Sequence, residues 1–299
     1  MGAAHDEPPA VARQRVRRAL RRGRQAAGLI QGDVAQRLGW SLSKVQRIES
    51  GDVGVSVTDL RALLTLYAVE DAATIGQLER DAAISRRQRW WIGAEYREHL
   101  TPGLRQLLQF EAEATAIRAY QPFIFPGVLQ TPLMADYLLG HFDKSLTEED
   151  RRVRFDVRML RAQRMVDHEN APTYLLMVDE AAIKREVGGR AVMAEQLERV
   201  VEIAQLPNIH IRIVKLAEGA TVGMLGPFTI LDLSDDDAED AVLYRESYTS
   251  DQVTHDPGTV SYYRARFEDM WPLCYGESDS LGLIRAEVAS LRASLIRDP

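Results

Sequence analysis

Apolar residues recur at helical spacing in two short segments near the N-terminus. One should begin near Gln31 and contains Val34, Ala35 and Leu38, and the other should begin at Ser41 and contains Val45 and Ile48. Apolar positions three and four residues apart predict amphipathic helices. A Gly39-Trp40 break separates the segments, and the Ser41 hydroxyl is a good cap for the second helix. Gly51 follows at a position that typically ends a helix. The pattern predicts helix, tight turn, helix.

Helices this short cannot bury a core alone, so they must pack on flanking helices. Val16 and Leu20 supply an apolar stripe upstream, and residues 57–67 supply one downstream. Because Val45 and Ile48 must face inward, the second helix presents its polar side outward. Leu42, Ser43, Gln46 and Arg47 occupy that side. Side chains in such a row are able to reach base edges in a DNA major groove.

Charge separates this module from the rest of the chain. Residues 10–50 hold ten Lys or Arg and two Asp or Glu, a net charge of +8, whereas the whole chain carries −7. A basic module on an acidic protein is the electrostatic pattern of phosphate binding. The alternative is a purely structural or protein-binding helical unit. We favour DNA binding, and we expect the acidic remainder to repel DNA and to have other partners.

This segment resembles the lambda-repressor-like (XRE) helix-turn-helix family over roughly residues 11–70. The matching residues are Leu20 to Arg22, Gly28-Leu29, Gln31, Val34-Ala35, Leu38-Gly39, Ser41, Ser43 to Val45, Arg47 to Glu49 and Gly51. The resemblance implies that Gln31 contacts a phosphate and that residues 42, 43, 46 and 47 meet bases. The complete set expected to contact DNA is Arg21, Gln31, Ser41, Leu42, Ser43, Lys44, Gln46 and Arg47.

Three positions depart from that family pattern. Gly23 stands where a core leucine is usual, which should cost on the order of 1 kcal/mol of helix propensity besides lost packing. Ile30 occupies the usual Ser or Thr capping position. Leu42 opens the recognition helix, so its base contact would be apolar, for example to a thymine methyl group. These departures bear on the target sequence rather than on the presence of the module.

The remaining chain mixes helical and strand patterns. Residues 1–9 read as a disordered arm, 10–84 as the helix-turn-helix domain, 85–103 as a connector and 104–299 as a C-terminal domain. Strands are expected at 174–178, 209–213, 228–233 and 242–246, and helices from Leu104, from Pro132, over 147–168, from Val192 to about 205, and twice near the C-terminus. We predict an α+β protein in which an all-α domain precedes a mostly helical domain with a small mixed sheet.

Two features of this domain are candidates for binding. The proline- and glycine-interrupted stretch from Tyr120 to Pro132 cannot be a regular helix, so it should cross the surface or line a groove. Tyr120, Phe123, Phe125 and Leu129, with Glu180 at a sheet edge, are the expected walls of a ligand or partner pocket. We expect Asp179, beside Glu180, to cap a helix.

Four arginines form the second feature, a basic stripe on the predicted helix at 147–168. Arg151, Arg154, Arg158 and Arg161 recur at spacings of three and four. The stripe would suit a phosphate or an acidic partner. A solvated helix face is the commoner explanation and the one we favour.

The C-terminal part resembles the uncharacterised effector-type domain that follows such a helix-turn-helix in many actinobacterial regulators, including antitoxin-like ones. The resemblance is carried by residues 110–114, 126–131, 179–181, 187–189, 195–197, 207–209, 226–228 and 244–246. It implies regulation through a small protein partner or an unknown ligand, with no established chemistry.

Catalytic and metal-binding patterns are missing from the sequence. It contains no G-x-S-x-G, H-E-x-x-H, G-x-x-x-x-G-K or G-x-G-x-x-G motif, so we expect no enzyme and no cofactor. The acidic turn at 235–240 lacks the glycine and distal glutamate of a calcium loop, and a solvated hairpin tip is favoured over a metal site. Neither a signal region nor a long apolar run is present, and a cytoplasmic protein is expected.

The sequence therefore predicts a sequence-specific, DNA-binding transcriptional regulator of the repressor type. It should act as a homodimer on double-stranded DNA, with a C-terminal domain that senses a small-molecule effector or a small protein partner. Two alternatives remain open. One is an antitoxin-like protein that neutralises a small partner, and the other is an enzyme domain fused to a DNA anchor.

Overall fold

The computed structural model of the chain describes residues 9–51, 53–85, 96, 98–142, 146–166, 171–218, 225–234, 240–246 and 251–297. The chain divides into two compact units, Met1–Gly93 and Ala94–Pro299. The division falls inside the connector expected at residues 85–103. Residues 86–95 of that connector, and residues 1–8 of the arm expected at 1–9, lie outside the described residues.

In its described residues the first unit contains helices and no strands, and the predicted pair of short helices is confirmed at its centre. Its helices are α1 (Pro9–Ala26), α2 (Gln31–Leu38), α3 (Leu42–Glu49), α4 (Val57–Leu66) and α5 (Ala72–Ser85). The inward-facing side chains form one core that includes Leu20 from α1, Val34 from α2, Val45 from α3 and Leu60 from α4. Each short helix is thus held by burial against its neighbours rather than by its own propensity.

Local signals fix where α2 and α3 begin and end. The Ser41 hydroxyl accepts a hydrogen bond from the Lys44 backbone amide at 3.2 Å, as expected of an N-cap. Gly39 adopts a left-handed φ of 67°, which turns the chain between the two helices. At Ile30, where a side-chain cap is missing, the Asp33 carboxylate accepts from the Ile30 amide at 2.9 Å and satisfies that donor instead.

Gly23, expected to leave a gap in the core, is closely covered by an aromatic side chain. A Cβ atom at position 23 would lie 3.0 Å from Cδ2 of Tyr67. Tyr67, at the end of α4, is buried and belongs to the core of the unit. The expected loss of packing is therefore wrong, because the Tyr67 ring fills the space that a leucine would need.

The second unit is a mixed α/β structure, which confirms the predicted fold class. Its elements are α7 (Pro102–Glu111), β1 (Ala116–Gln121), α8 (Pro132–Phe142), α9 (Glu148–Val166), β2 (Thr173–Asp179), α10 (Glu180–Lys184), α11 (Arg190–Ile203), β3 (Ile209–Val214), β4 (Phe228–Asp232), β5 (Ala241–Glu246), β6 (Asp251–Thr254), α13 (Pro257–Met270) and α14 (Glu277–Arg297). In the part of the chain that the structure describes, no helix is long and apolar enough to cross a membrane.

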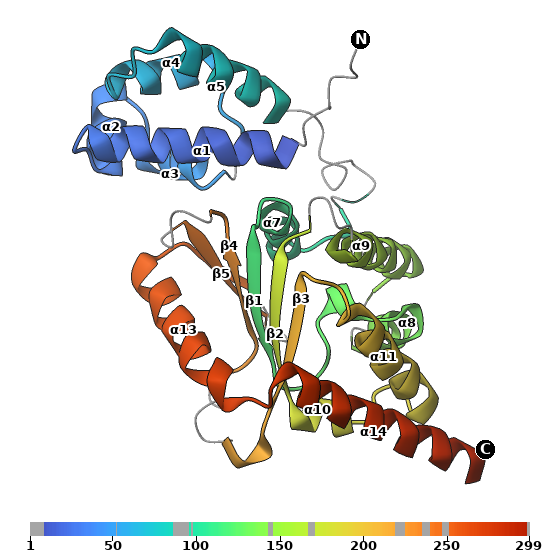
Figure 1. Cartoon of the computed structure of the whole chain (residues 1–299). Helices are drawn as coiled ribbons and strands as arrows, with labels where there is room; N and C mark the ends of the chain where they lie inside the picture. The colour runs from blue at the N-terminus through green and yellow to red at the C-terminus, as the bar shows by residue number, and fades with distance from the viewer. Residues whose placement is uncertain are drawn as a thin grey trace, which may run out of the picture. The chain divides into compact units, whose positions relative to one another are not determined.

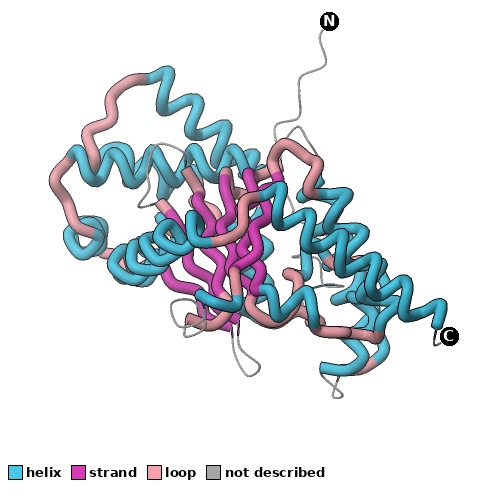
Figure 2. Tube along the Cα trace, turned by 60° about the horizontal axis from the view of Figure 1, so that its bottom comes forward, coloured by secondary structure: helices cyan, strands magenta, loops and turns pink. Residues whose placement is uncertain are grey.

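Within the described residues, six strands form one sheet in the order β3-β2-β1-β4-β5-β6. β1 pairs with β2, and β2 with β3, in parallel, whereas β1–β4, β4–β5 and β5–β6 are antiparallel. Figure 2 shows the strands side by side, with helices around them. The sheet is larger than the sequence predicted, because the central strand β1 and the edge strand β6 were not expected.

Helices cover both faces of this sheet. Side chains of α7, α8, α9 and α11 pack on the face that contains Ile117 and Ala119 of β1. α13 covers the opposite face, where Tyr120 packs against Phe228 with ring centroids 5.9 Å apart. α8, α9 and α11 are seen on one side of the sheet and α13 on the other in Figure 1. The segment expected to be irregular from Tyr120 onward therefore begins inside the central strand.

Candidate functional site

The outer side of α3 carries the side chains that the sequence predicted to meet DNA bases. Leu42 is 46% exposed, and Ser43, Gln46 and Arg47 are also exposed. Val45 and Ile48 lie on the inner side of the helix and are buried in the core. The expected orientation of the helix is confirmed, and its exposed row has the donors and the apolar group that base recognition uses.

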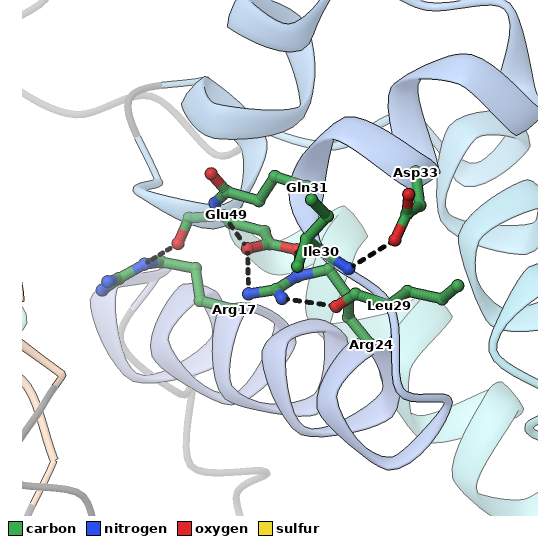
Figure 3. Close-up of polar contacts among 7 residues, drawn as sticks. All are labelled: Arg17, Arg24, Leu29, Ile30, Gln31, Asp33 and Glu49. Atoms are coloured by element: carbon green, nitrogen blue, oxygen red, sulfur yellow. Dashed lines mark hydrogen bonds and ion pairs between the residues drawn. The ribbon is translucent and has the colours of Figure 1, made fainter.

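Glu49, the last residue of α3, holds the helix against α1 and α2. Its side chain accepts from Arg24 Nε at 2.7 Å and from Arg24 Nη2 at 3.1 Å. Gln31 Nε2 donates to Glu49 Oε2 at 2.8 Å, and Arg17 Nε donates to the Glu49 backbone carbonyl at 3.1 Å. Figure 3 shows these contacts converging on Glu49. A buried, bidentate pair of this kind fixes geometry as well as charge.

Several arginines of α1 make contacts that stabilise the unit. Arg13 Nη2 donates to the Ser85 carbonyl at 2.9 Å, and Arg15 forms an ion pair with the fully buried Asp81 at 3.0 Å. Arg17 and Arg24 are engaged with α3, as described above. The guanidinium groups of these four residues therefore already have acceptors within the unit. Arg21 is half-buried on the same helix.

Three other residues expected at the DNA surface also make contacts within the unit. Lys44 Nζ forms an ion pair with Asp59 Oδ1 at 2.9 Å and lies 3.7 Å from the centre of the Trp40 ring. Gln31 uses one amide N–H for Glu49, which leaves a second N–H for a phosphate. The Ser41 hydroxyl is exposed and accepts from the backbone of α3. These contacts position α3 whether or not the same side chains also contact DNA.

A cavity of about 760 Å³ lies in the second unit, between α7, α9 and the sheet. Its apolar lining includes Leu107, Ile117 and Phe125. Its polar lining includes Tyr174 and Tyr244, whose pKa values are raised by burial. Both phenols are therefore neutral at ordinary pH and remain hydrogen-bond donors. The volume is typical of sites for small molecules.

Arginines of α9 form one wall of this cavity. Arg154, Arg158 and Arg161 all line it, whereas Arg151 is exposed elsewhere on the helix. The solvated face that the sequence favoured is thus wrong for three of the four residues. Spacing placed them on one face correctly, but that face packs toward the sheet.

Two of the cavity arginines differ in how their charge is balanced. Arg161 donates two hydrogen bonds to Glu111, of 2.6 and 2.8 Å, and this carboxylate raises the pKa of Arg161 although burial acts to lower it. Arg158 Nη1 donates to Gln130 Oε1 at 2.7 Å, and no carboxylate of the described residues forms an ion pair with it. Burial, with the repulsion of Arg161, lowers the pKa of Arg158 to about 10.

Two matches to known protein families divide the chain as the structure does. Residues 15–78 match a family described as a helix-turn-helix domain, and residues 104–286 match one described as a domain of unknown function (DUF5753). The second match covers more than half of the 299 residues. The chain belongs to the DUF5753 family. No curated protein and no solved structure matches it.

The walls predicted for a pocket in the DUF5753 domain are mostly elsewhere. Phe125 lines the cavity, but Tyr120 lies on the opposite face of the sheet, in the core beneath α13. Leu129 is buried in the main core, and Phe123 is 55% exposed outside the cavity. Glu180 accepts from the Leu216 amide at 3.4 Å. The prediction treated the segment as one surface, whereas alternation along β1 sends Tyr120 to the other side.

Sequence reasoning missed the residues that organise both sites. Glu49 was recognised only as part of a family pattern, and its burial follows from a contact with Arg24, 25 residues away. The sequence assigned no role to Glu111 or Gln130.

The prediction that Asp179 caps a helix is confirmed. Its carboxylate accepts a hydrogen bond from the Ala181 backbone amide at 2.8 Å, at the start of α10. This contact gives the carboxylate at the end of β2 a structural role. The acidic residues 235–239 lie outside the described residues.

Proposed function

We propose that this protein is a sequence-specific, DNA-binding transcriptional regulator that acts as a homodimer and is controlled through its DUF5753 domain. The observation that carries the proposal is the exposed row Leu42, Ser43, Gln46 and Arg47 on α3 of a helix-turn-helix domain. The proposal assigns base recognition to this row and assigns no catalytic activity to the chain. In a two-fold dimer, two copies of α3 would read half-sites about one helical turn apart.

The contacts behind α3 support this role. Base readout requires side chains that are presented from a rigid backbone, because a loosely held helix loses the geometry of bidentate hydrogen bonds. Glu49 ties the end of α3 to α1 and α2, and Lys44 ties its first turn to Asp59 near the start of α4. Arg47, between these anchors, is exposed. Arg47 and Gln46 are therefore assigned the base hydrogen bonds.

The test is a comparison of Arg47→Ala with the native protein on two duplexes. A preferred site is first selected from a randomised duplex library, and its scrambled version is the second duplex. Arg47→Ala should lose about 1–3 kcal/mol of binding free energy on the selected site and little on the scrambled one. Fluorescence anisotropy at several salt concentrations measures both affinities.

Arg80→Ala is the matched control, since it removes the same charge from an exposed position on α5. It should leave the difference between the two duplexes unchanged. Equal losses on both duplexes for Arg47→Ala would reject base recognition by Arg47. Failure of the native protein to prefer any duplex in the selection would reject sequence-specific binding.

A further inference from the structure

The arrangement of charge in the DUF5753 cavity is unusual for a wall of hydrophobic core. Burying a guanidinium group away from water is costly unless an anion or several acceptors compensate it. Arg161 has such compensation in Glu111. Arg158, one turn away on the same face of α9, has the single acceptor Gln130 among the described residues, and Arg154 Nε donates to the His99 carbonyl at 3.0 Å. Neither forms an ion pair within the described chain.

Neighbouring groups hold Arg158 in place for a further partner. Gln130 Nε2 donates to the Phe125 carbonyl at 2.6 Å, which fixes the amide whose oxygen accepts from Arg158. Gly127 lies alongside, where a Cβ atom would come 3.3 Å from Arg158 Nε. A guanidinium group has five N–H donors in a planar fork. With one donor used, most of the fork remains for a planar or tetrahedral anion.

We propose that this cavity binds a small organic anion, a carboxylate or a phosphate ester with an apolar portion, whose charged group is held by Arg158 and Arg154. Leu107, Ile117 and Phe125 would contact the apolar portion. This inference deepens the proposed function. Only one part of it, that the bound anion is the effector of a regulator, rests on that function. Anion binding itself is independent of DNA.

Three carboxylates of the described residues also line the cavity, and each is balanced within the protein or affects anion binding through its own protonation. Glu111 is neutralised by Arg161, and Asp251 accepts a hydrogen bond from the Thr101 hydroxyl at 3.0 Å. Glu246 lies at the end of β5, and desolvation with the nearby Asp251 raises its pKa, although Arg161 and Arg158 oppose the rise. An anion bound at Arg158 would favour the protonated form of Glu246 further. Affinity for an anion of constant charge should then increase as the pH falls.

Calorimetric titration of the full-length protein tests the proposal with four probes. Phenylacetate and phenyl phosphate present the two anionic groups on the same apolar ring, phenethyl alcohol is the neutral counterpart, and inorganic phosphate lacks the apolar portion. At least one of the two aromatic anions should bind at least about tenfold more tightly than phenethyl alcohol and than inorganic phosphate. The stronger of the two identifies the preferred anionic group.

Three variants assign the binding to the cavity. Arg158→Gln should weaken the stronger anion by about tenfold or more, whereas Arg151→Gln, which removes an exposed arginine from the same helix, should leave it unchanged. Glu246→Gln should strengthen binding and abolish the pH dependence of phenylacetate affinity. Circular dichroism establishes that each variant is folded. Should Arg158→Gln not fold, the Glu246→Gln and pH results decide in its place.

The proposal is overturned if neither aromatic anion binds in the millimolar range, or if phenethyl alcohol binds as tightly as both. It is also overturned if folded Arg158→Gln and Arg151→Gln bind the anion equally. A protein that binds the anion but prefers no duplex would overturn the proposed function alone. A protein that prefers a duplex but binds no anion would overturn this inference alone.

Discussion

Glu49 illustrates how one buried residue organises a surface it does not belong to. Its side chain is almost inaccessible to solvent, yet it lies two residues from the exposed Arg47 on the same helix. Arg24 and Gln31 approach its carboxylate from α1 and α2. Removing the charge would leave the Arg24 guanidinium buried without its anion, which is costlier than losing an exposed pair.

Glu49→Gln should therefore destabilise the helix-turn-helix unit by about 3 kcal/mol. Hydrogen–deuterium exchange by mass spectrometry measures this locally, and amides of α1 and α3 that exchange through opening of the unit should exchange about a hundredfold faster. Gln46→Ala, on the exposed side of α3, is the control and should leave exchange within about twofold of the native rate. Native-like protection in Glu49→Gln would show that Arg24 does not depend on this carboxylate.

At the scale of elements, the ring of Tyr67 at the end of α4 packs against Gly23 of α1, where the absence of a side chain leaves room for the ring. The family pattern suggests leucine at position 23, but a Cβ atom there would already lie 3.0 Å from the ring. The benefit of leucine for helix propensity is about 1 kcal/mol. Forcing extra atoms into a filled core typically costs about 1–3 kcal/mol.

Gly23→Leu alone should thus destabilise the unit, and Gly23→Leu combined with Tyr67→Ala should recover part of the loss. Exchange protection of α1 and α4 amides reports both effects. If Gly23→Leu is as stable as the native protein, and adding Tyr67→Ala brings no further stability, then the Tyr67 ring moves aside at little cost in free energy.

The elements differ in how far the sequence revealed them. α3 was predictable because one side faces the core and the other faces solvent, so that apolar residues recur along its sequence with the period of a helix. β1 was not, because it is central in the sheet and each of its faces mixes apolar and polar residues. Arg118, which breaks the alternation, is accommodated by an ion pair with Asp232 on the adjacent strand β4. That pairing depends on residues more than a hundred positions apart.

The cavity of the DUF5753 domain was likewise not predictable from the sequence. Spacing showed that Arg154, Arg158 and Arg161 share one face of a helix, but spacing does not reveal what a face packs against. Exposed charged faces are common, and buried ones are rare unless they are paired. The partner that permits burial here, Glu111, lies 50 residues from Arg161. Only the fold of the DUF5753 domain brings them together.

For the whole molecule, net charge overstates the cations that are available to DNA. Of the ten Lys and Arg in residues 10–50, five make the internal contacts described above: Arg13, Arg15, Arg17, Arg24 and Lys44. Each phosphate contact contributes about −0.9 to the slope of log affinity against log salt concentration. If all ten cations contacted phosphates, DNA affinity would depend on salt concentration much more steeply than the structure permits.

If the phosphate contacts come from residues 10–50, the salt slope for the selected duplex should be no steeper than about −4.5 per protomer. Anisotropy titrations at several potassium chloride concentrations measure it. Arg15→Gln, at an arginine paired with Asp81, serves as the comparison and should leave the slope unchanged if the variant is folded. A slope near −9 per protomer would mean that the internal pairs open when DNA binds.

The strand order has a consequence for synthesis on the ribosome. β1 is made first and acquires β2 and β3 on one side, but its other side is completed only when β4 emerges, more than a hundred residues later. Until then the growing chain carries an open row of backbone donors and acceptors at the middle of its future sheet, the kind of edge that recruits strands from other chains. The helix-turn-helix domain, finished long before, can already be folded while its companion domain still depends on protection from aggregation.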